Sequence, residues 1–218
     1  MANSNDDSKS FEFSATLLEA PVSADSPLTG SVGTIFGGPG GQIAGKLVIV
    51  ETLLGLVTRD LSYQEFMIES LIAIIKVVRC EAGSILELNH ETNTLFFRAV
   101  AGTASDRLSQ FSVPMGQGIV GHVAQTRLPM CVSNLKDNPL YLKAVGNAVD
   151  FEARNLVALP IIIRGKIFGV LELLNRLGDE AFTESDTELL TYTCEMMAKA
   201  IEIRLMISWN RKAEKQAA

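Results

Sequence analysis

Three cysteines and two histidines are the residues best suited to metal binding or thiol chemistry. Cys80, Cys131 and Cys194 lie far apart in the chain, and His90 and His122 are not spaced as metal ligands. Without a CxxC or an HExxH pattern, these residues do not supply a zinc site. An odd number of separated cysteines fits free thiols in a reducing compartment better than a disulfide framework. We therefore expect no metal and no cofactor.

A second candidate for chemistry is a glycine-rich run at residues 40–46. Its sequence, GGQIAGK, satisfies the GxxxxGK spacing with which backbone amides and a lysine hold phosphates. The next residue is Leu47, where a serine or threonine must hold magnesium, and only the short segment 32–36 could form the strand that precedes such a loop. We interpret the run as a chance match in a linker.

Composition restricts the class of protein. The chain has 218 residues, of which 47% are hydrophobic and 20% charged, as in one soluble globular domain. Its net charge of −6 argues against binding to nucleic acid or to an anionic membrane. The start is polar and acidic, unlike a signal peptide, and the richest apolar stretch, 71–78, is too short to span a bilayer. We expect a cytoplasmic protein.

The N-terminal part differs in composition from the rest. Residues 1–45 contain seven of the 17 glycines and three of the seven prolines, and acidic residues outnumber basic ones. Such a stretch is typical of a flexible tail. We expect a flexible acidic tail over 1–45, a folded domain over 46–210 and a short basic tail over 211–218.

Hydrophobic periodicity and turn signals predict an α+β fold. We expect helices near residues 47–58, 62–78, 119–126 and from 184 onward. We expect strands near residues 84–88, 94–100, 109–113, 128–132, 155–163 and 166–174. Capping signals at Ser62-Tyr63-Gln64-Glu65 and Thr183-Glu184-Ser185-Asp186 start two of the helices. This order indicates an antiparallel sheet of about six strands sandwiched by helices.

The last helix carries two apolar stripes. One consists of Leu189, Thr193, Met196, Ala200, Ile203 and Ile207. The other consists of Leu190, Cys194, Met197, Ile201 and Leu205. A helix that covers one face of a sheet needs only one broad stripe. The second stripe therefore predicts either a helical-bundle homodimer or a wide face that is buried within one subunit.

Three local sequences, in order and correctly spaced, resemble those of GAF domains, which are sensors of small molecules. The segment 116–124, GQGIVGHVA, is similar to the family's G-x-G-I-x-G-x-V-A, and segments 151–161 and 169–176 are similar to its fifth and sixth strands. The resemblance covers about residues 61–207. It implies the family's PAS-like sandwich, but the family includes both ligand-binding and empty domains.

A structural signature of the family is partly matched. Asn175-Arg176, Phe182 and Asp186 resemble the N-K and F-x3-D-E elements found in cyclic-nucleotide-binding members, although Thr187 replaces the last glutamate. In the family this signature is thought to brace the structure. We therefore expect a structural ion pair between Arg176 and Asp186.

The residues that contact cyclic GMP in the family are not retained. Val100 and Ala101 stand where an aromatic residue and an acid would bind the base. Buried polar groups left without these partners each cost about 1–3 kcal/mol. We therefore expect that neither cyclic GMP nor cyclic AMP binds in the usual way.

What the resemblance leaves is a mostly apolar, cyclic-nucleotide-like pocket. The apolar side chains expected to line it are Val100, Ile119, Val120, Leu142, Val149 and Phe151. Ser84, Asn155 and Glu172 are the expected polar groups, and a buried Glu172 must be paired or neutralised. The pocket then holds an apolar small molecule, or its side chains simply fill the space as core.

An enzyme remains the third class. Free-methionine-sulfoxide reductases with this fold use a cysteine just before the fifth strand, but the segment 151–157 contains none. Cys131 is then the one possible thiol near the pocket. We expect a non-catalytic regulatory domain that senses a small molecule, forms a homodimer and signals in trans to an unknown protein partner; a ligand-free adaptor and a thiol reductase are the alternatives.

Overall fold

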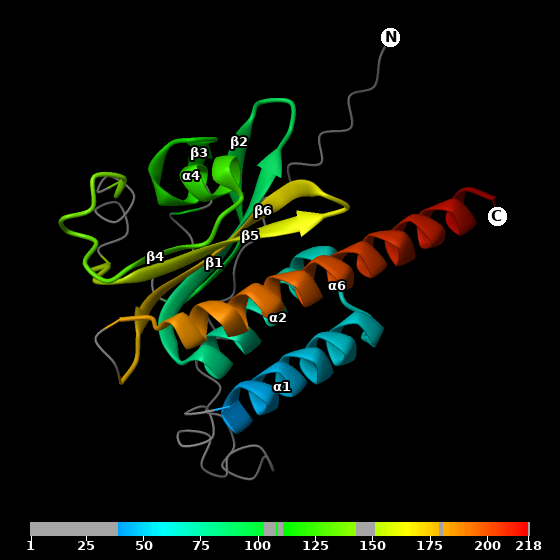
Figure 1. Cartoon of the computed structure of the whole chain (residues 1–218). Coiled ribbons are helices and arrows are strands. Elements are labelled where there is room, and N and C mark those ends of the chain that lie inside the picture. The colour runs from blue at the N-terminus through cyan, green and yellow to red at the C-terminus, as the bar shows by residue number, and fades with distance from the viewer. Residues whose placement is uncertain (1–38, 103–107, 109–110, 143–150, 179–180, 218) are drawn as a thin grey trace. The chain divides into compact units, whose positions relative to one another are not determined.

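An antiparallel sheet organises the chain (Figure 1). The computed structural model describes residues 39–102, 108, 111–142, 151–178 and 181–217. Within them the sheet has six strands in the order β3-β2-β1-β6-β5-β4. The strands are β1 (Cys80–Asn89), β2 (Thr94–Ala101), β3 (Ser112–Pro114), β4 (Met130–Val132), β5 (Leu156–Ile163) and β6 (Lys166–Arg176). The predicted α+β architecture is confirmed.

Tight turns connect the two long hairpins, as their sequences predict. Between β1 and β2, the side chain of Asn89 accepts hydrogen bonds from two backbone amides of the turn, and Asn93 adopts a positive φ of 56°. Between β5 and β6, Arg164 and Gly165 both have positive φ, at 50° and 75°. Positive φ at both central residues matches the right-handed twist of the strands they join.

The described helices are α1 (Pro39–Thr58), α2 (Tyr63–Val78), α4 (Gly118–Thr126) and α6 (Glu184–Ala217). Both predicted capping signals are formed. At α2, Ser62 Oγ accepts the Glu65 N–H at 3.2 Å, and Glu65 Oε2 accepts the Ser62 N–H at 2.7 Å. Thr183 and Asp186 exchange the same pair of bonds at α6, at 3.1 and 2.9 Å. Each pair satisfies backbone amides that the first helical turn leaves without partners.

Helix α1 begins at Pro39, before the predicted start at Leu47. The last residues of the predicted tail are therefore helical, and the run 40–46 lies inside a helix rather than in a linker or a phosphate-binding loop. Glycines lower helix propensity and concealed this start, whereas a proline at the first helical position is favourable. Contacts with α6 also stabilise the first turns: Gln42 Nε2 donates to Ser185 Oγ at 2.8 Å and to Glu188 Oε2 at 2.9 Å.

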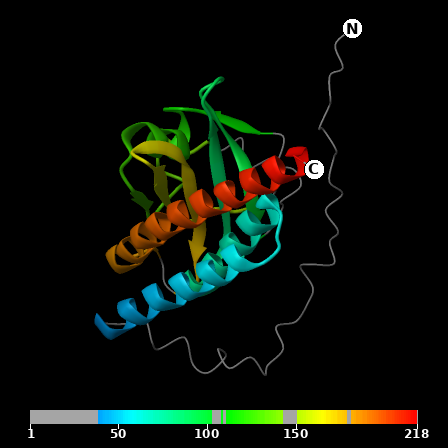
Figure 2. The same ribbon diagram turned by 90° about the vertical axis from the view of Figure 1, so that its right-hand side faces the viewer.

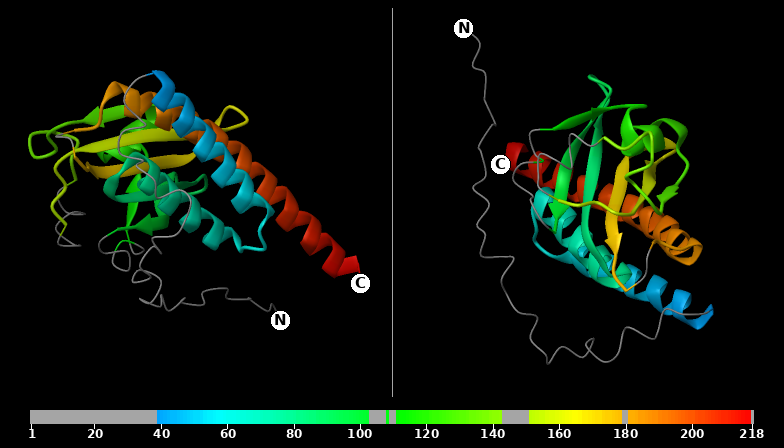
Figure 3. Two further views of the ribbon diagram at one scale, coloured as in Figure 1. Left: turned by 90° about the horizontal axis from the view of Figure 1, so that it is seen from below. Right: turned by 90° about the vertical axis from the view of Figure 1, so that its left-hand side faces the viewer.

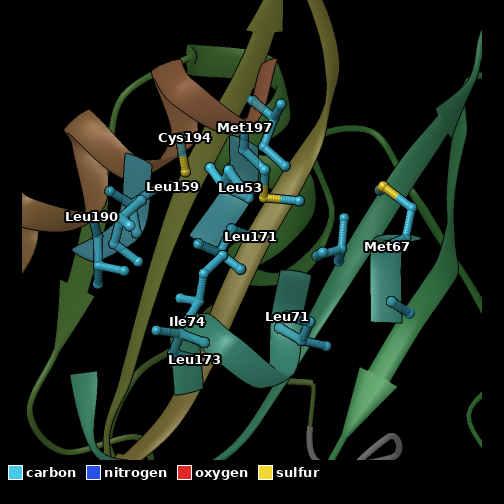
Figure 4. Close-up of a cluster of buried hydrophobic side chains, with 14 of the residues drawn as sticks. Leu53, Met67, Leu71, Ile74, Leu159, Leu171, Leu173, Leu190, Cys194 and Met197 are labelled. Atoms are coloured by element: carbon cyan, nitrogen blue, oxygen red, sulfur yellow. The ribbon is translucent and has the colours of Figure 1, made fainter. Parts of the chain in front are cut away.

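Helices α1, α2 and α6 cover one face of the sheet (Figures 1 and 2). Figure 4 shows part of the core between them, in which Leu53 of α1 and Met197 of α6 lie over β5 and β6, and Met67 of α2 lies over β1 and β2. From β6, Leu171 and Leu173 are fully buried in this core. Helix α4 packs on the opposite face of the sheet, over a second core that includes Val170. The apolar strands β5 and β6 are thus covered on both faces, as predicted.

Helices α1 and α6 run side by side in the same direction (Figures 2 and 3). Beyond the first-turn contacts, Lys46 Nζ lies 5.3 Å from the centre of the Tyr192 ring. At the other end of α1, buried Arg204 donates to the backbone oxygen of Val57 at 3.2 Å and to that of Arg59 at 2.9 Å, and it also donates to that of Leu61. A cation beside the carbonyls at a helix C-terminus is favourable.

This pairing accounts for much of the first apolar stripe of the last helix. Leu189, Thr193 and Ala200 are buried within the chain. In the second stripe, Leu190, Cys194, Met197 and Ile201 are buried in the core beneath α6. The first four turns therefore form a wide face buried within one subunit. Beyond them, Ile203, Met206 and Trp209 are exposed, Trp209 at 71%.

Candidate ligand pocket

A cavity of about 100 Å³ lies on the face of the sheet that carries α4. Its walls come from β1, β2, β3, β5, β6, α4, Leu108 and the segments on either side of residues 143–150. Among the described lining residues, Ser84, Tyr141 and Glu172 are the ones with polar side chains. The volume is somewhat smaller than the roughly 150 Å³ of an apolar cavity that binds benzene. It is therefore suited to a small molecule.

Glu172 lies in the middle of β6; part of the residue is exposed, but its carboxyl group lies inside the protein. It pairs in register with Ser84 of β1, whose Oγ donates a hydrogen bond to Glu172 Oε2 at 3.0 Å. Burial raises the pKa of the Glu172 carboxyl to about 7, and the bond from Ser84 acts in the opposite direction. Near neutral pH this carboxyl is therefore divided between its protonated and ionised forms.

Tyr141 is a lining residue that sequence reasoning missed. A turn before it positions the ring: Tyr141 N donates to the Asn138 backbone oxygen at 3.1 Å, and Asn138 Oδ1 accepts the Leu140 N–H at 2.9 Å. Burial, and then the charge of Glu172, raise the pKa of the phenol. The signal available in the sequence was Asn138-Pro139, which favours a turn.

Most of the predicted pocket residues meet at the cavity. They are Ser84, Val100, Ile119, Val120, Leu142, Phe151 and Glu172. Val149 lies outside the described residues. Asn155 is the exception: it is buried but does not line the cavity, because its Oδ1 accepts the Arg176 N–H at 3.0 Å. Asn155 precedes β5 and joins it to the end of β6 rather than facing a ligand.

Phe97 of β2 and Leu174 of β6 also line the cavity without having been predicted. Strand alternation could have indicated Leu174, because residues two apart face the same side and Glu172 was already assigned to the pocket. For Phe97 the same rule misleads, because the pairing of β1 with β2 shifts register between Ile85 and Leu86. Such a shift changes which residues face each side.

A comparison with known protein families agrees with this architecture of a sheet, flanking helices and a cavity. A family model described as "GAF domain" matches residues 60–202, which is well over half of the chain. The chain belongs to the GAF domain family. The family resemblance predicted from three short segments is confirmed.

Relatives of this GAF domain include regulatory proteins. It is 26% identical over 172 residues to the Nif-specific regulatory protein of Azospirillum brasilense, covering 77% of this chain and 27% of that protein. It is also 27% identical over 82 residues to the rod cGMP-specific 3',5'-cyclic phosphodiesterase subunit alpha of Mus musculus, covering 38% and 10%. The chain thus spans about a quarter of the length of the first relative and a tenth of the second.

Solved structures agree on the fold. The GAF domain of A. aeolicus nlh2 in an inactive state superposes with a TM-score of 0.61 at 21% identity, over 75% of this chain and 99% of that one. Free methionine-R-sulfoxide reductase from Neisseria meningitidis superposes with a TM-score of 0.63 at 14% identity, over 76% and 93%. At these identities the likeness concerns the fold alone.

The partly matched signature of this GAF domain forms a buried brace. Arg176 Nε lies 3.2 Å from Asp186 Oδ2, so the predicted ion pair is present, and Phe182 is buried beside it. Asn175 is fully buried; its Nδ2 donates to Glu81 Oε2 at 2.8 Å and to the Glu152 backbone oxygen at 2.9 Å. The ion pair ties the end of β6 to the start of α6, and the bonds of Asn175 tie it to β1 and to the segment before β5.

Cys131 does not line the pocket of this GAF domain, contrary to the expectation that it lies near it. It pairs in register with Val157, which belongs to the core beneath the helices, so its side chain faces that side. Its Sγ lies 3.5 Å from the Phe182 backbone oxygen. Partial burial, and then the charge of Asp186, raise the pKa of the thiol, which disfavours the reactive thiolate.

Neither a metal-binding cluster nor a membrane-spanning helix occurs in the described residues. The described residues contain no group of three or more His, Cys, Asp or Glu side chains that could hold a metal ion. None of the helices in the described part of the chain is both long and apolar enough to cross a membrane. His90 is exposed at the tip of the β1–β2 hairpin.

Proposed function

We propose that this GAF domain is a non-catalytic sensor that binds a small molecule in the cavity and transmits its presence through α1 and α6. The observation that carries the proposal is the cavity itself, which is apolar apart from Ser84, Tyr141 and Glu172 among the described lining residues. An apolar cavity with a few polar groups is the usual form of a small-molecule site. The regulatory relatives support the same reading.

Cyclic nucleotides are unsuitable occupants, even though one relative is a cGMP-specific phosphodiesterase. No lysine, arginine or histidine occurs among the described lining residues, so nothing there neutralises a phosphate. Val100 also lines the cavity where the resemblance places a stacking aromatic residue. We expect titration with cyclic GMP to give no binding heat, and saturable binding would contradict this part of the proposal.

The positions of the thiols support a non-catalytic role. Cys131 faces away from the cavity, and Cys80 and Cys194 are buried. The expected result is no NADPH-coupled reduction of free methionine sulfoxide, either by the wild type or by Cys131→Ser. Reductase activity that Cys131→Ser abolishes would replace the sensor with an enzyme.

Strand β6 offers a direct route from the cavity to the helices. Glu172 faces the cavity, while its neighbours Leu171 and Leu173 are buried beneath α2 and α6. A ligand that shifts β6 therefore changes the surface on which these helices pack. Such a ligand acts by favouring one of two packings of the helices.

An exposed apolar stripe on α1 supports a homodimer. Ile43, Leu47 and Leu54 are 63%, 65% and 58% exposed, and their spacing places them on one face of the helix. We expect these residues and the exposed apolar residues at the end of α6 to pack against the same two helices of a second copy. A bundle of four helices would then carry the signal.

Native mass spectrometry of the freshly purified protein tests ligand and assembly together. A dimer with an added small mass is the expected result. A mass equal to the chain, or to twice the chain, with no pocket ligand found by screening, would favour a ligand-free adaptor in which the cavity is a packing defect.

The dimer surface has its own test. The double change Leu47→Glu with Leu54→Glu places charges on the exposed stripe and is expected to give a monomer in sedimentation equilibrium. Leu128→Glu is the matched control, because Leu128 is equally exposed at 67% but lies after α4, outside the stripe. A wild-type chain that sediments as a monomer at all concentrations would overturn the assembly.

A further inference from the structure

The carboxyl group of Glu172 is the unusual feature of the cavity. Burying an ionised carboxylate among apolar groups is costly unless it is paired. Here Ser84 donates one hydrogen bond to Oε2 at 3.0 Å. Within the part of the chain that the structure describes, no basic side chain bonds to Glu172, and none lines the cavity. The described walls of the cavity therefore present a negative group without a positive partner.

The remaining walls restrict what can approach this group. Phe97, Tyr141 and Phe151 bring three aromatic side chains to the lining, and aliphatic side chains supply most of the rest. Aromatic faces attract cations and accommodate apolar bodies. Anions are disfavoured by Glu172, and large polar molecules exceed a cavity of about 100 Å³.

We propose that the cavity binds a small organic cation, in which an apolar body occupies the aromatic and aliphatic walls and a protonated amine pairs with the Glu172 carboxylate. This assignment rests on the sensor function proposed above, and it adds the chemical class of the ligand. Ser84 is a positioning residue, since it holds Oε2 and leaves Oε1 for the amine.

Binding of this kind is linked to protons. Free Glu172 has a pKa raised by burial to about 7, so below that pH the carboxyl must lose its proton before it pairs with the cation. Tyr141 is the other titratable group among the described lining residues, and its raised pKa keeps it neutral in this range. The residues that flank Glu172 in register on β1 and β5 are Ser84 and Ala158, which do not titrate here. The affinity for a cation therefore rises with pH and levels off above about pH 7.

Three probes with the same branched apolar body separate charge from shape: isoamylamine, isoamyl alcohol and isovalerate. Binding is measured from amide chemical shifts of the full chain in NMR titrations at pH 6 and pH 8. At pH 8 we expect the amine to bind about tenfold more tightly than the alcohol, as a charge-assisted bond implies, and isovalerate not to bind. At pH 6 the amine is expected to bind about tenfold more weakly than at pH 8.

Two variants complete the test. Glu172→Gln is expected to remove both the preference for the amine and the pH dependence while binding of the alcohol persists. Ser84→Ala removes the hydrogen bond that lowers the pKa of Glu172, so the rise in affinity for the amine should occur at higher pH. Equal affinities for amine and alcohol in the wild type would overturn the cation assignment and leave the sensor function standing. Absence of binding by all three probes, together with a ligand-free native mass, would overturn the sensor function as well.

Discussion

The buried carboxyl of Glu172 predicts a stability that depends on pH in the ligand-free protein. Its pKa is raised from an ordinary value of 4.5 to about 7, so the folded state holds a proton that the unfolded state releases between these values. Stability is therefore lost as the pH rises from about 4.5 to 7, and it stays at the lower level above pH 7. The full cost of ionising Glu172 in the folded protein is about 3 kcal/mol.

Glu172→Gln removes this titration and keeps the shape of the side chain, including an oxygen that accepts the hydrogen bond of Ser84. We expect the variant to be about 3 kcal/mol more stable than the wild type at pH 8.5 and within about 1 kcal/mol of it at pH 5. The assay is urea denaturation at a series of pH values and one fixed protein concentration, because association would otherwise alter the apparent stability.

The shape of the pH dependence decides the outcome. The difference between variant and wild type should rise by about 2–3 kcal/mol from pH 5 to pH 8.5, with most of the rise below pH 7. A difference that stays constant over this range would mean that Glu172 titrates like an exposed carboxyl. That result would refute the reasoning from burial and remove the basis for a pH-dependent affinity.

Three further predictions concern the frame around the cavity. Arg204→Met leaves three backbone carbonyls at the α1–α2 junction without their donor, and urea denaturation should show a loss of about 3 kcal/mol. Gly169→Ala places a methyl group against the backbone oxygen of Leu86 and should lower the stability by an amount on the order of 3 kcal/mol. Gly55→Ala is the control: its methyl group meets open space, so it should stabilise α1 by about 0.5–1 kcal/mol. Equal effects of the two substitutions would contradict the close packing of β1 and β6. Cys131 should react with a disulfide reagent at pH 8 more slowly than free cysteine, because its pKa is raised; a rapid reaction in the folded protein would indicate an activated thiol.

The elements that local chemistry determines were the ones that the sequence predicted well. The capping signals at Ser62 and Thr183 and the turn at Arg164-Gly165 depend on neighbouring residues, and each is formed. The start of α1 was missed because Gly40 and Gly41 oppose a helix when considered alone. Contacts with α6, which is distant in the sequence, offset that preference.

The site was predicted less completely because facing directions depend on tertiary structure. The side of the sheet that Cys131 faces is determined by its pairing with Val157, which no local pattern reveals. Likewise, the stripe that contains Leu189 and Thr193 correctly indicated a buried face, but periodicity does not say whether the covering helix belongs to the same chain. Tyr141 lies in a segment without periodicity, and the turn signal at Asn138-Pro139 does not show that its ring reaches the cavity.

The alternation of side chains along β6 has a practical consequence for protein engineering. Val170, Glu172 and Leu174 face the cavity or the core around it, whereas Leu171 and Leu173 support the helices. The residues that line the cavity are thus different from those that pack against the helices, although both sets alternate along one strand. Redesign of the even-numbered positions should give sensors for other molecules that retain the same output.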